Sequence, residues 1–349
     1  MNTEMPISVC MIVKNEEALL KASIVSAVNI LKFDEIIVVD TGSTDKTKDI
    51  AVDSGARVFD FVWINDFAAA RNFATEKAKN DWIFLLDADE EITEADLISI
   101  RKFIENTSNV GVVTRVELSN MEATPNSRLY NRNFYEMKGT IHEQITPIGV
   151  HSKVLTDIPI TMIHHGYIPE ISKAKGTHER NSRMLKEALE KQPNDPYLLY
   201  KLGNAYYYRD MHEACKYLEQ ALSLITDFSL LYVYKAVELY GYALINTEQY
   251  EKALDVRNKY AKYYENKPQF RFLQAHIYQN NGKFQEAVQS YESCIGADVA
   301  DFSGITSYLS YYNIGVILEC VGMIEEAIDI YIKCGDYEPA QQRLAELAS

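Results

Sequence analysis

The sequence predicts an α/β domain with a mostly parallel sheet, followed by an all-helical repeat domain. In the first part of the chain, short apolar runs alternate with helical stretches, which is the pattern of βαβ units. After about Arg180 the pattern changes to a helical period with recurring small residues, aromatic residues and Glu-Ala pairs. A length of 349 residues suits two domains. We expect one domain over residues 1–180 and another over 181–349.

The elements of the first domain are predicted in chain order from these patterns. Strands are expected at residues 7–13, 35–39, 57–61 and 82–86, and helices at 17–29, 45–54 and 67–78. Residues 112–175 mix short strands with Tyr, His and Gly, and we expect them to complete this domain. Ligand contacts in such a sheet should lie just after the carboxyl ends of the strands.

The second domain contains a repeated pair of helices. In each pair a small residue of the first helix precedes an alanine of the second by 11 or 12 positions: Gly203 with Ala214, Gly241 with Ala253, Ala275 with Ala287, and Gly315 with Ala327. This spacing resembles that of the tetratricopeptide repeat. Helix pairs of this kind stack into a superhelix whose concave face is suited to peptides.

Composition narrows the class of protein. A formal net charge of -15 argues against non-specific nucleic-acid binding, which depends on clustered Lys and Arg, and against docking on an anionic membrane. No apolar segment approaches the roughly 20 residues that a transmembrane helix needs, and no signal peptide is recognisable. We therefore expect a cytoplasmic protein with no transmembrane segment and no nucleic-acid partner. The five cysteines are scattered, as reduced core thiols are.

Two carboxylates, Asp87 and Asp89, follow the apolar run at residues 82–86. The end of a buried strand is where an open α/β sheet presents its ligand site. Two like charges at that place need a positive partner, and a divalent cation that bridges a phosphorylated substrate would supply one. The alternative is an acidic helix start without a ligand, because Asp and Glu favour first turns.

Other strand ends carry further polar residues. Asp40 begins a turn with a single glycine, which supports neither a P-loop nor a dinucleotide-binding motif but suits hydrogen bonds to a ribose or a nucleobase. The alternative is a capped turn with no ligand. Asn15 and Glu16 directly follow the first strand, also on the ligand side. Arg71 lies in a helix of small and apolar residues, where it either pairs with a structural carboxylate or reaches a nucleotide.

Four motifs in this order resemble those of the family 2 glycosyltransferases, which have the GT-A fold, a Rossmann-like α/β fold. They are Met11-Ile-Val-Lys-Asn-Glu16, Val38-Val-Asp-Thr-Gly-Ser-Thr-Asp45, Asp66-Phe-Ala-Ala-Ala-Arg-Asn72 and Leu86-Asp-Ala-Asp-Glu90. Together with the tetratricopeptide repeats, they make the chain similar to the subgroup that includes the sublancin-type peptide S-glycosyltransferases. The resemblance covers almost the whole chain.

The resemblance implies a UDP-sugar donor and a Mn²⁺ or Mg²⁺ cofactor. By analogy, Asp40 would contact the uracil end of the nucleotide, with Arg71 nearby. Asp87 would approach the ribose, and Asp89 would bind the cation on the diphosphate. His164, within Ile163-His-His-Gly-Tyr167, matches the histidine of the family's His-x-Gly element, which completes the metal site.

The resemblance also implies a catalytic base. The segment Gly139-Thr-Ile-His-Glu-Gln144 is similar to the family's glycine loop and the acidic position that follows it. Glu143 would take the proton of an acceptor hydroxyl or thiol as it attacks the anomeric carbon, and this direct displacement inverts the configuration. Many relatives carry Asp at this place, and His142 remains an alternative base.

The sequence therefore predicts a metal-dependent inverting glycosyltransferase. Its acceptor would be a Cys, Ser or Thr side chain of a peptide or protein, gathered between the catalytic domain and the repeats. Two alternatives remain: a transferase that acts on a cell-envelope glycan or lipid carrier, and a tetratricopeptide scaffold whose transferase domain is inactive. The identity of the sugar and the formation of a homodimer are left open.

Overall fold

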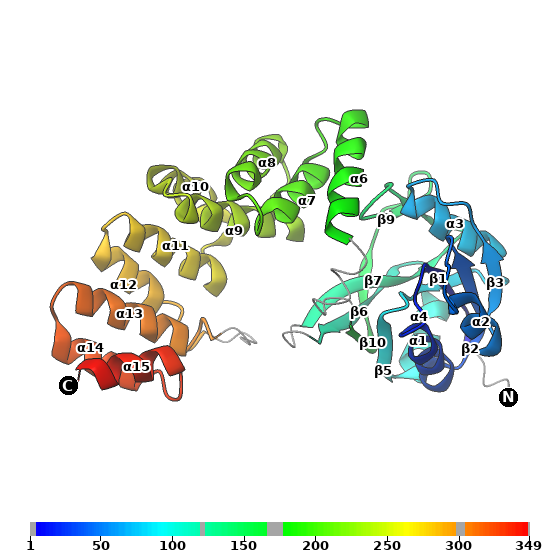
Figure 1. Ribbon diagram of the computed structural model, residues 1–349, viewed down its shortest axis with the longest axis horizontal. Coiled ribbons are helices and arrows are strands. Elements are labelled where there is room, and N and C mark those ends of the chain that lie inside the picture. The colour runs from blue at the N-terminus through cyan, green and yellow to red at the C-terminus, as the bar shows by residue number, and fades with distance from the viewer. Residues whose placement is uncertain (1–4, 119–122, 166–176, 298–303, 348–349) are drawn as a thin grey trace. The chain divides into compact units, whose positions relative to one another are not determined.

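The chain forms two compact units, Met1–Met184 and Leu185–Ser349, in the computed structural model (Figure 1). The structure describes residues 5–118, 123–165, 177–297 and 304–347. Helix α6 (Thr177–Lys191) spans the division between the units and begins three residues before the boundary at residue 180 that the sequence suggested. Each unit has apolar cores of its own.

An eight-stranded sheet forms the centre of the first unit, in the order β3-β2-β1-β4-β7-β6-β10-β5. Its strands are β1 (Met5–Val13), β2 (Phe33–Asp40), β3 (Arg57–Asp60), β4 (Trp82–Leu85), β5 (Glu90–Ala95), β6 (Val110–Glu117), β7 (Ala123–Asn131) and β10 (Leu155–His164). The pairs β1–β2, β2–β3, β1–β4 and β6–β10 are parallel, and β4–β7, β6–β7 and β5–β10 are antiparallel. The predicted mostly parallel α/β fold is confirmed.

Helices cover both faces of this sheet. On one face lie α1 (Leu20–Ser26), α2 (Thr47–Asp53) and α4 (Leu97–Asn106), and on the other lie α3 (Phe67–Lys77) and a small hairpin of β8 (Tyr135–Lys138) and β9 (Gln144–Pro147). The helix predicted over residues 17–29 is present in two parts, α1 and a π-helical turn (Ala27–Leu31). Both Ala27 and Leu31 are fully buried, so the wider turn keeps this apolar face on the sheet.

Strand β1 shows why the sheet needs two covering layers. Its odd-numbered residues pack toward α1, while Cys10 packs toward α3. A central parallel strand is buried on both faces in this way, which explains its nearly continuous apolar sequence. The parallel strands β1, β2 and β4 end at the same edge of the sheet, where Asp40 is the last residue of β2 and Asn15 and Asp87 lie just beyond β1 and β4.

A buried carboxylate ties the opposite edge of this sheet together. Glu35 of β2 accepts hydrogen bonds from the Ser8 hydroxyl (2.6 Å), the Lys79 backbone N–H and Arg57 Nη1 (2.8 Å), and its side chain is 6% exposed. Burial by itself would raise the pKa of Glu35, but these hydrogen bonds outweigh it and lower that pKa.

We expect Glu35→Ala to lower the free energy of unfolding by about 2 kcal/mol, because the buried Ser8 hydroxyl and two more exposed donors lose a charged acceptor. Urea unfolding followed by circular dichroism would measure it, with the exposed Glu105→Ala on α4 as the control. Since the pKa of Glu35 is lower in the folded protein, its ionic contribution is complete at neutral pH and is lost as the pH falls through the folded-state pKa. A constant difference between the wild type and Glu35→Gln down to strongly acidic pH would contradict this account.

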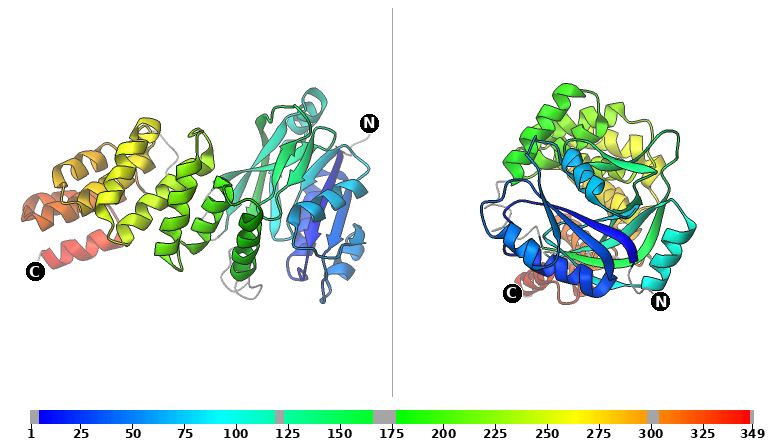
Figure 2. Two further views of the ribbon diagram at one scale, coloured as in Figure 1. Left: turned by 90° about the horizontal axis from the view of Figure 1, so that it is seen from above. Right: turned by 90° about the vertical axis from the view of Figure 1, so that its right-hand side faces the viewer.

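The second unit is a row of antiparallel helix pairs that follow one another in chain order, as Figures 1 and 2 show from green to red. Its helices after α6 are α7 (Pro196–Tyr206), α8 (Met211–Leu224), α9 (Leu231–Asn246), α10 (Tyr250–Tyr264), α11 (Pro268–Asn280), α12 (Phe284–Glu292), α13 (Tyr308–Cys320), α14 (Ile324–Ile332) and α15 (Glu338–Leu347). The four small-residue pairs fall on α7–α8, α9–α10, α11–α12 and α13–α14, as the repeat predicted.

Close helix packing explains the small residues. A Cβ atom added to Gly203 would lie 2.7 Å from Leu218 Cγ, and one added to Gly315 would lie 2.6 Å from the Tyr331 ring. Neither neighbour can make room cheaply inside a packed core.

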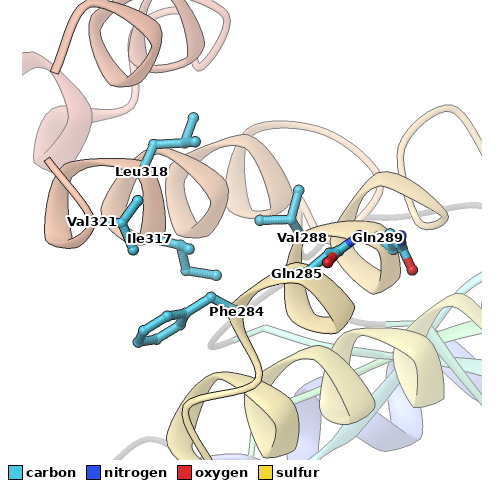
Figure 3. Close-up of a pocket in the computed structure, with 7 residues that line it drawn as sticks. All are labelled: Phe284, Gln285, Val288, Gln289, Ile317, Leu318 and Val321. Carbon is cyan, nitrogen blue, oxygen red and sulfur yellow. The ribbon is translucent and has the colours of Figure 1, made fainter. Parts of the chain in front are cut away.

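The second unit also has an apolar hollow between α12 and α13, whose lining is drawn in Figure 3. Among the described residues, no helix is long and apolar enough to cross a membrane.

Candidate active site

The last residue of β2 closes the loop that follows this strand. Asp40 is 3% exposed, and its carboxylate accepts the backbone N–H groups of Gly42 and Ser43 at 3.0 Å each. Gly42 has φ +105, a left-handed conformation that favours glycine. The turn is thus closed by the Asp40 side chain, whereas α2 begins after Lys46 without a side-chain cap. A carboxylate has further lone pairs, so this turn also leaves acceptor capacity on Asp40.

The residues after β1 bind this loop. The Asn15 N–H donates to Ser43 Oγ (2.9 Å), and Asn15 Oδ1 accepts the Thr44 N–H (2.8 Å). The Glu16 N–H donates to Thr47 Oγ1 (2.7 Å) at the start of α2. These bonds join two neighbouring strand ends, so Asn15, Glu16 and Asp40 belong to one local structure.

Two arginines provide the positive partners of Asp87. Arg71 Nη2 lies 2.8 Å from Asp87 Oδ1, and Arg128 Nη2 lies 3.0 Å from Asp87 Oδ2. Burial by itself would raise the pKa of Asp87, but the two guanidinium charges outweigh it and hold that pKa far below its usual range. The sequence indicated that the paired aspartates need a positive partner. For Asp87, this partner is arginine.

Arg71 also contacts the candidate base. Its Nε lies 2.5 Å from Glu143 Oε1, and the Arg71 and Glu143 side chains are 8% and 12% exposed. Asp66 caps the start of α3 by accepting the Ala69 N–H at 2.9 Å. Of the two roles that the sequence allowed for Arg71, pairing with carboxylates is the one observed. The helix thereby connects Asp87 to Glu143.

The loop that carries Glu143 is anchored to the same helix. The Phe67 N–H donates to the Thr140 carbonyl at 2.9 Å. His142 adopts φ +53, which is uncommon for a residue other than glycine. This geometry turns the chain sharply between Thr140 and Glu143. A strained backbone beside a candidate base agrees with a functional loop.

The side chains of Asp89 and His164 face each other. His164 Nε2 lies 3.7 Å from Asp89 Oδ1, and His164 Nδ1 lies 2.7 Å from Glu117 Oε2. Burial by itself would lower the pKa of the imidazole, but its contacts with Asp89 and Glu117 outweigh burial and raise that pKa. The His165 N–H donates to the Asp89 carbonyl at 2.8 Å, which fixes the backbone of Asp89.

These two side chains fit a divalent cation. A carboxylate and an imidazole are suitable donors, and a cation with ligand distances of about 2.1 Å can contact both Asp89 and His164 across 3.7 Å. Glu117 on the other ring nitrogen is the kind of partner that orients a ligating histidine. In the part of the chain that the structure describes, no three His, Cys, Asp or Glu side chains form a metal cluster by themselves. Substrate phosphates and water would then complete the coordination, as is usual for Mg²⁺.

Sequence reasoning missed the roles of Arg115 and Glu90, and offered for Arg128 either a contact with the pyrophosphate or acceptor or a structural ion pair. Arg128 contacts both Asp87 and Glu90, and Arg115 Nη2 lies 2.6 Å from Glu117 Oε1. All three residues are charged and lie on strands of the sheet, yet Glu90 and Arg128 are buried. Arg115 lies in the mostly apolar strand β6, and a charged residue in such a strand usually needs a partner, which was an available signal. Glu90 and Arg128 lie in the largely polar strands β5 and β7, where no such signal exists.

Two family models match separate parts of the chain. Residues 8–157 match the model of glycosyl transferase family 2, and residues 268–298 match that of a tetratricopeptide repeat. The chain therefore contains a family 2 glycosyltransferase domain followed by a tetratricopeptide-repeat region, as the motifs predicted.

Individual relatives cover part of the chain. A TPR repeat-containing protein of Synechococcus elongatus is 33% identical over 228 residues, which is 62% of this chain and 56% of that protein. The SPbeta prophage-derived glycosyltransferase SunS of Bacillus subtilis is 27% identical over 218 residues, 56% of this chain and 49% of that protein. The chain thus spans about half the length of these curated relatives. A crystal structure of MamA aligns with 51% of this chain and 97% of its own, with a TM-score of 0.40 and 21% identity.

Proposed function

We propose that this protein is a metal-dependent inverting glycosyltransferase that moves a sugar from a UDP-sugar to a peptide side chain. The observation that carries the proposal is the gathering of Asp87, Asp89, Glu143 and His164 at one edge of a family 2 glycosyltransferase domain. Glu143 and His164 are far in the sequence from the two aspartates, and ion pairs connect Asp87 to Glu143 through Arg71.

The donor would bind along the strand ends. Asp40, with Asn15 and Glu16, would receive the uracil end, and Asp87 would accept a hydrogen bond from the ribose. The Asp87 side chain is 31% exposed, so its oxygens remain accessible although Arg71 and Arg128 hold them. The two arginines fix the rotamer of Asp87, which reduces the cost of ordering it when the nucleotide binds.

Asp89 and His164 would hold Mn²⁺ or Mg²⁺ on the diphosphate. The bound cation supplies neutralisation of the negative charge that develops on departing UDP. Glu117 keeps the His164 ring in place through Nδ1, so that Nε2 is presented toward Asp89.

Glu143 would act as the general base. The acceptor oxygen or sulfur forms a bond to the anomeric carbon while its proton passes to the Glu143 carboxylate, and the bond from that carbon to the UDP oxygen breaks. Only an ionised carboxylate can accept the proton, and the Arg71 guanidinium lies beside this carboxylate and holds its position. His142 is the second candidate, since it is the neighbouring residue of the same loop.

The peptide acceptor is the finer part of the proposal. It is supported by the tetratricopeptide-repeat region and by similarity to SunS, which is named a glycosyltransferase. A Cys, Ser or Thr side chain would supply the nucleophile.

A panel of UDP-sugars incubated with Mn²⁺ and candidate peptides tests the proposal. We expect release of UDP with one preferred sugar, and a hexose mass increment on the peptide by mass spectrometry. If the sugar is transferred to a glycan or lipid carrier instead, the proposed donor chemistry stands and the proposed peptide acceptor is wrong. If no sugar is turned over and UDP causes no thermal shift, the transferase domain is inactive and the protein is a scaffold.

A further inference from the structure

Glu90 is a fully buried carboxylate beside the paired aspartates, and the proposed reaction does not use it. Its Oε2 accepts the Asp87 N–H at 3.1 Å, and its own N–H donates to the Asp87 carbonyl at 3.1 Å. The turn that carries Asp89 is therefore closed by Glu90 from both sides. A side chain that bonds back to the backbone in this way fixes the shape of a short turn.

Glu90 also meets two arginines inside the sheet. Arg128 contacts Glu90 Oε1 directly, and Arg115 Nη1 lies 3.7 Å from the same oxygen. The Nε atoms of both arginines are buried without a hydrogen-bond partner in the described part of the chain. Such orphan donors cost free energy, so the remaining contacts of these guanidinium groups must compensate for it.

The register of three strands places Glu90 next to the proposed metal ligand. His164 of β10 lies opposite Glu90 of β5 on one side and opposite Glu117 of β6 on the other. Residues opposite each other in a sheet point to the same face. The Arg115 guanidinium lies near both Glu90 and Glu117, and Glu117 in turn contacts His164 Nδ1. A continuous ionic link thus joins the turn of Asp89 to the ring of His164.

We propose that Glu90 and Arg115 are positioning residues that hold Asp89 and His164 at the spacing required to share one divalent cation. Glu90 fixes the turn on the Asp89 side, and Arg115 with Glu117 fixes the ring on the His164 side. The inference rests on the proposed function only in that this site binds Mn²⁺ together with UDP. Outer partners of metal ligands commonly change metal affinity or activity by about 10- to 100-fold.

The test measures Mn²⁺ binding to the full-length protein in the presence of UDP, from the electron paramagnetic resonance signal of free Mn²⁺. Glu90→Gln keeps the size of the side chain and an oxygen for the Asp87 N–H, but removes the charge that faces Arg115 and Arg128. We expect about 10- to 100-fold weaker Mn²⁺ binding. For Arg115→Gln, which keeps the contacts of Asp87 with Arg71 and Arg128, affinity for UDP without metal, from isothermal titration calorimetry, should stay within about twofold of the wild type.

Glu94→Gln is the matched control, because it makes the same substitution on β5 at an exposed position. Its Mn²⁺ affinity should equal that of the wild type. Arg115→Gln, at a position whose side chain is 21% exposed, should weaken Mn²⁺ binding as Glu90→Gln does. The double variant should lose little more than either single variant, because both substitutions interrupt one link.

The outcomes separate the inference from the proposed function. If the wild type binds no Mn²⁺ with UDP, the metal assignment itself fails. If the wild type binds Mn²⁺ and folded Glu90→Gln and Arg115→Gln bind it equally well, the positioning role is overturned while the proposed function stands. A loss of metal-free UDP affinity in Arg115→Gln as large as its loss of Mn²⁺ affinity also overturns it, since the effect would then be general. If Glu90→Gln fails to fold, Arg115→Gln alone decides.

Discussion

Asp89→Ala is expected to abolish sugar transfer and metal-dependent binding of UDP. Asp89 supplies the carboxylate of the proposed cation site, and alanine leaves His164 as the single protein ligand identified there. Loss of charge neutralisation at the leaving group costs several kcal/mol of transition-state stabilisation, which corresponds to a fall in rate on the order of 10³-fold or more. Initial rates with saturating Mn²⁺ and a Mn²⁺ titration of UDP binding would measure both effects.

The exposed Asp157→Ala on β10 provides a matched control for this substitution. It removes the same carboxylate from the strand that carries His164, and should leave rate and binding unchanged. Circular dichroism of Asp89→Ala should match the wild type, because the Asp89 backbone contact with His165 uses the carbonyl and not the side chain. Retained transfer by folded Asp89→Ala would remove this residue from the metal site.

Glu143→Gln is expected to stop transfer while leaving donor binding intact. Glutamine keeps an oxygen that can accept the hydrogen bond of Arg71, so the loop and Asp87 should keep their positions. It cannot take the acceptor proton, and general-base catalysis commonly contributes about 10²- to 10⁴-fold to a rate. Transfer should fall by that factor, with Mn²⁺–UDP affinity within about twofold of the wild type.

His142→Ala is the variant that distinguishes the two candidate bases. It lies in the same loop, so a purely structural disturbance of the loop would affect both variants alike. If His142→Ala stops transfer and Glu143→Gln does not, His142 is the base. If both lose donor binding together with transfer, neither residue has been identified as a base, and the loop is required for the nucleotide site as a whole.

The fold was predictable where the determining pattern is local. The βαβ rhythm up to β4 follows from short apolar runs and helical periods, and the helix pairs follow from regular small residues that packing requires, such as Gly203. The strands beyond β4 were not placed one by one. Their pairing depends on partners far along the chain, as in His164 opposite Glu90, and no local period encodes such a register.

The candidate site was predictable residue by residue but not as a network. Asp40 ends β2, Asp87 and Asp89 follow β4, and a position at a strand's carboxyl end by itself marks a ligand edge. The ion pairs are different in kind: Arg71 meets Glu143 across 72 positions, and Arg128 meets Glu90 across 38. Which arginine neutralises which carboxylate depends on the completed sheet, so the sequence could only offer pairing as one of two roles for Arg71.

The sharing of arginines between carboxylates limits how this site can change during evolution. Arg71 serves Asp87 and Glu143 together, and Arg128 serves Asp87 and Glu90. Lysine offers a point charge in place of a planar fork, so even Arg→Lys would leave one of two acceptors without its donor. Accepted replacements should therefore come as coordinated sets, whereas surface positions of the repeats can drift one at a time.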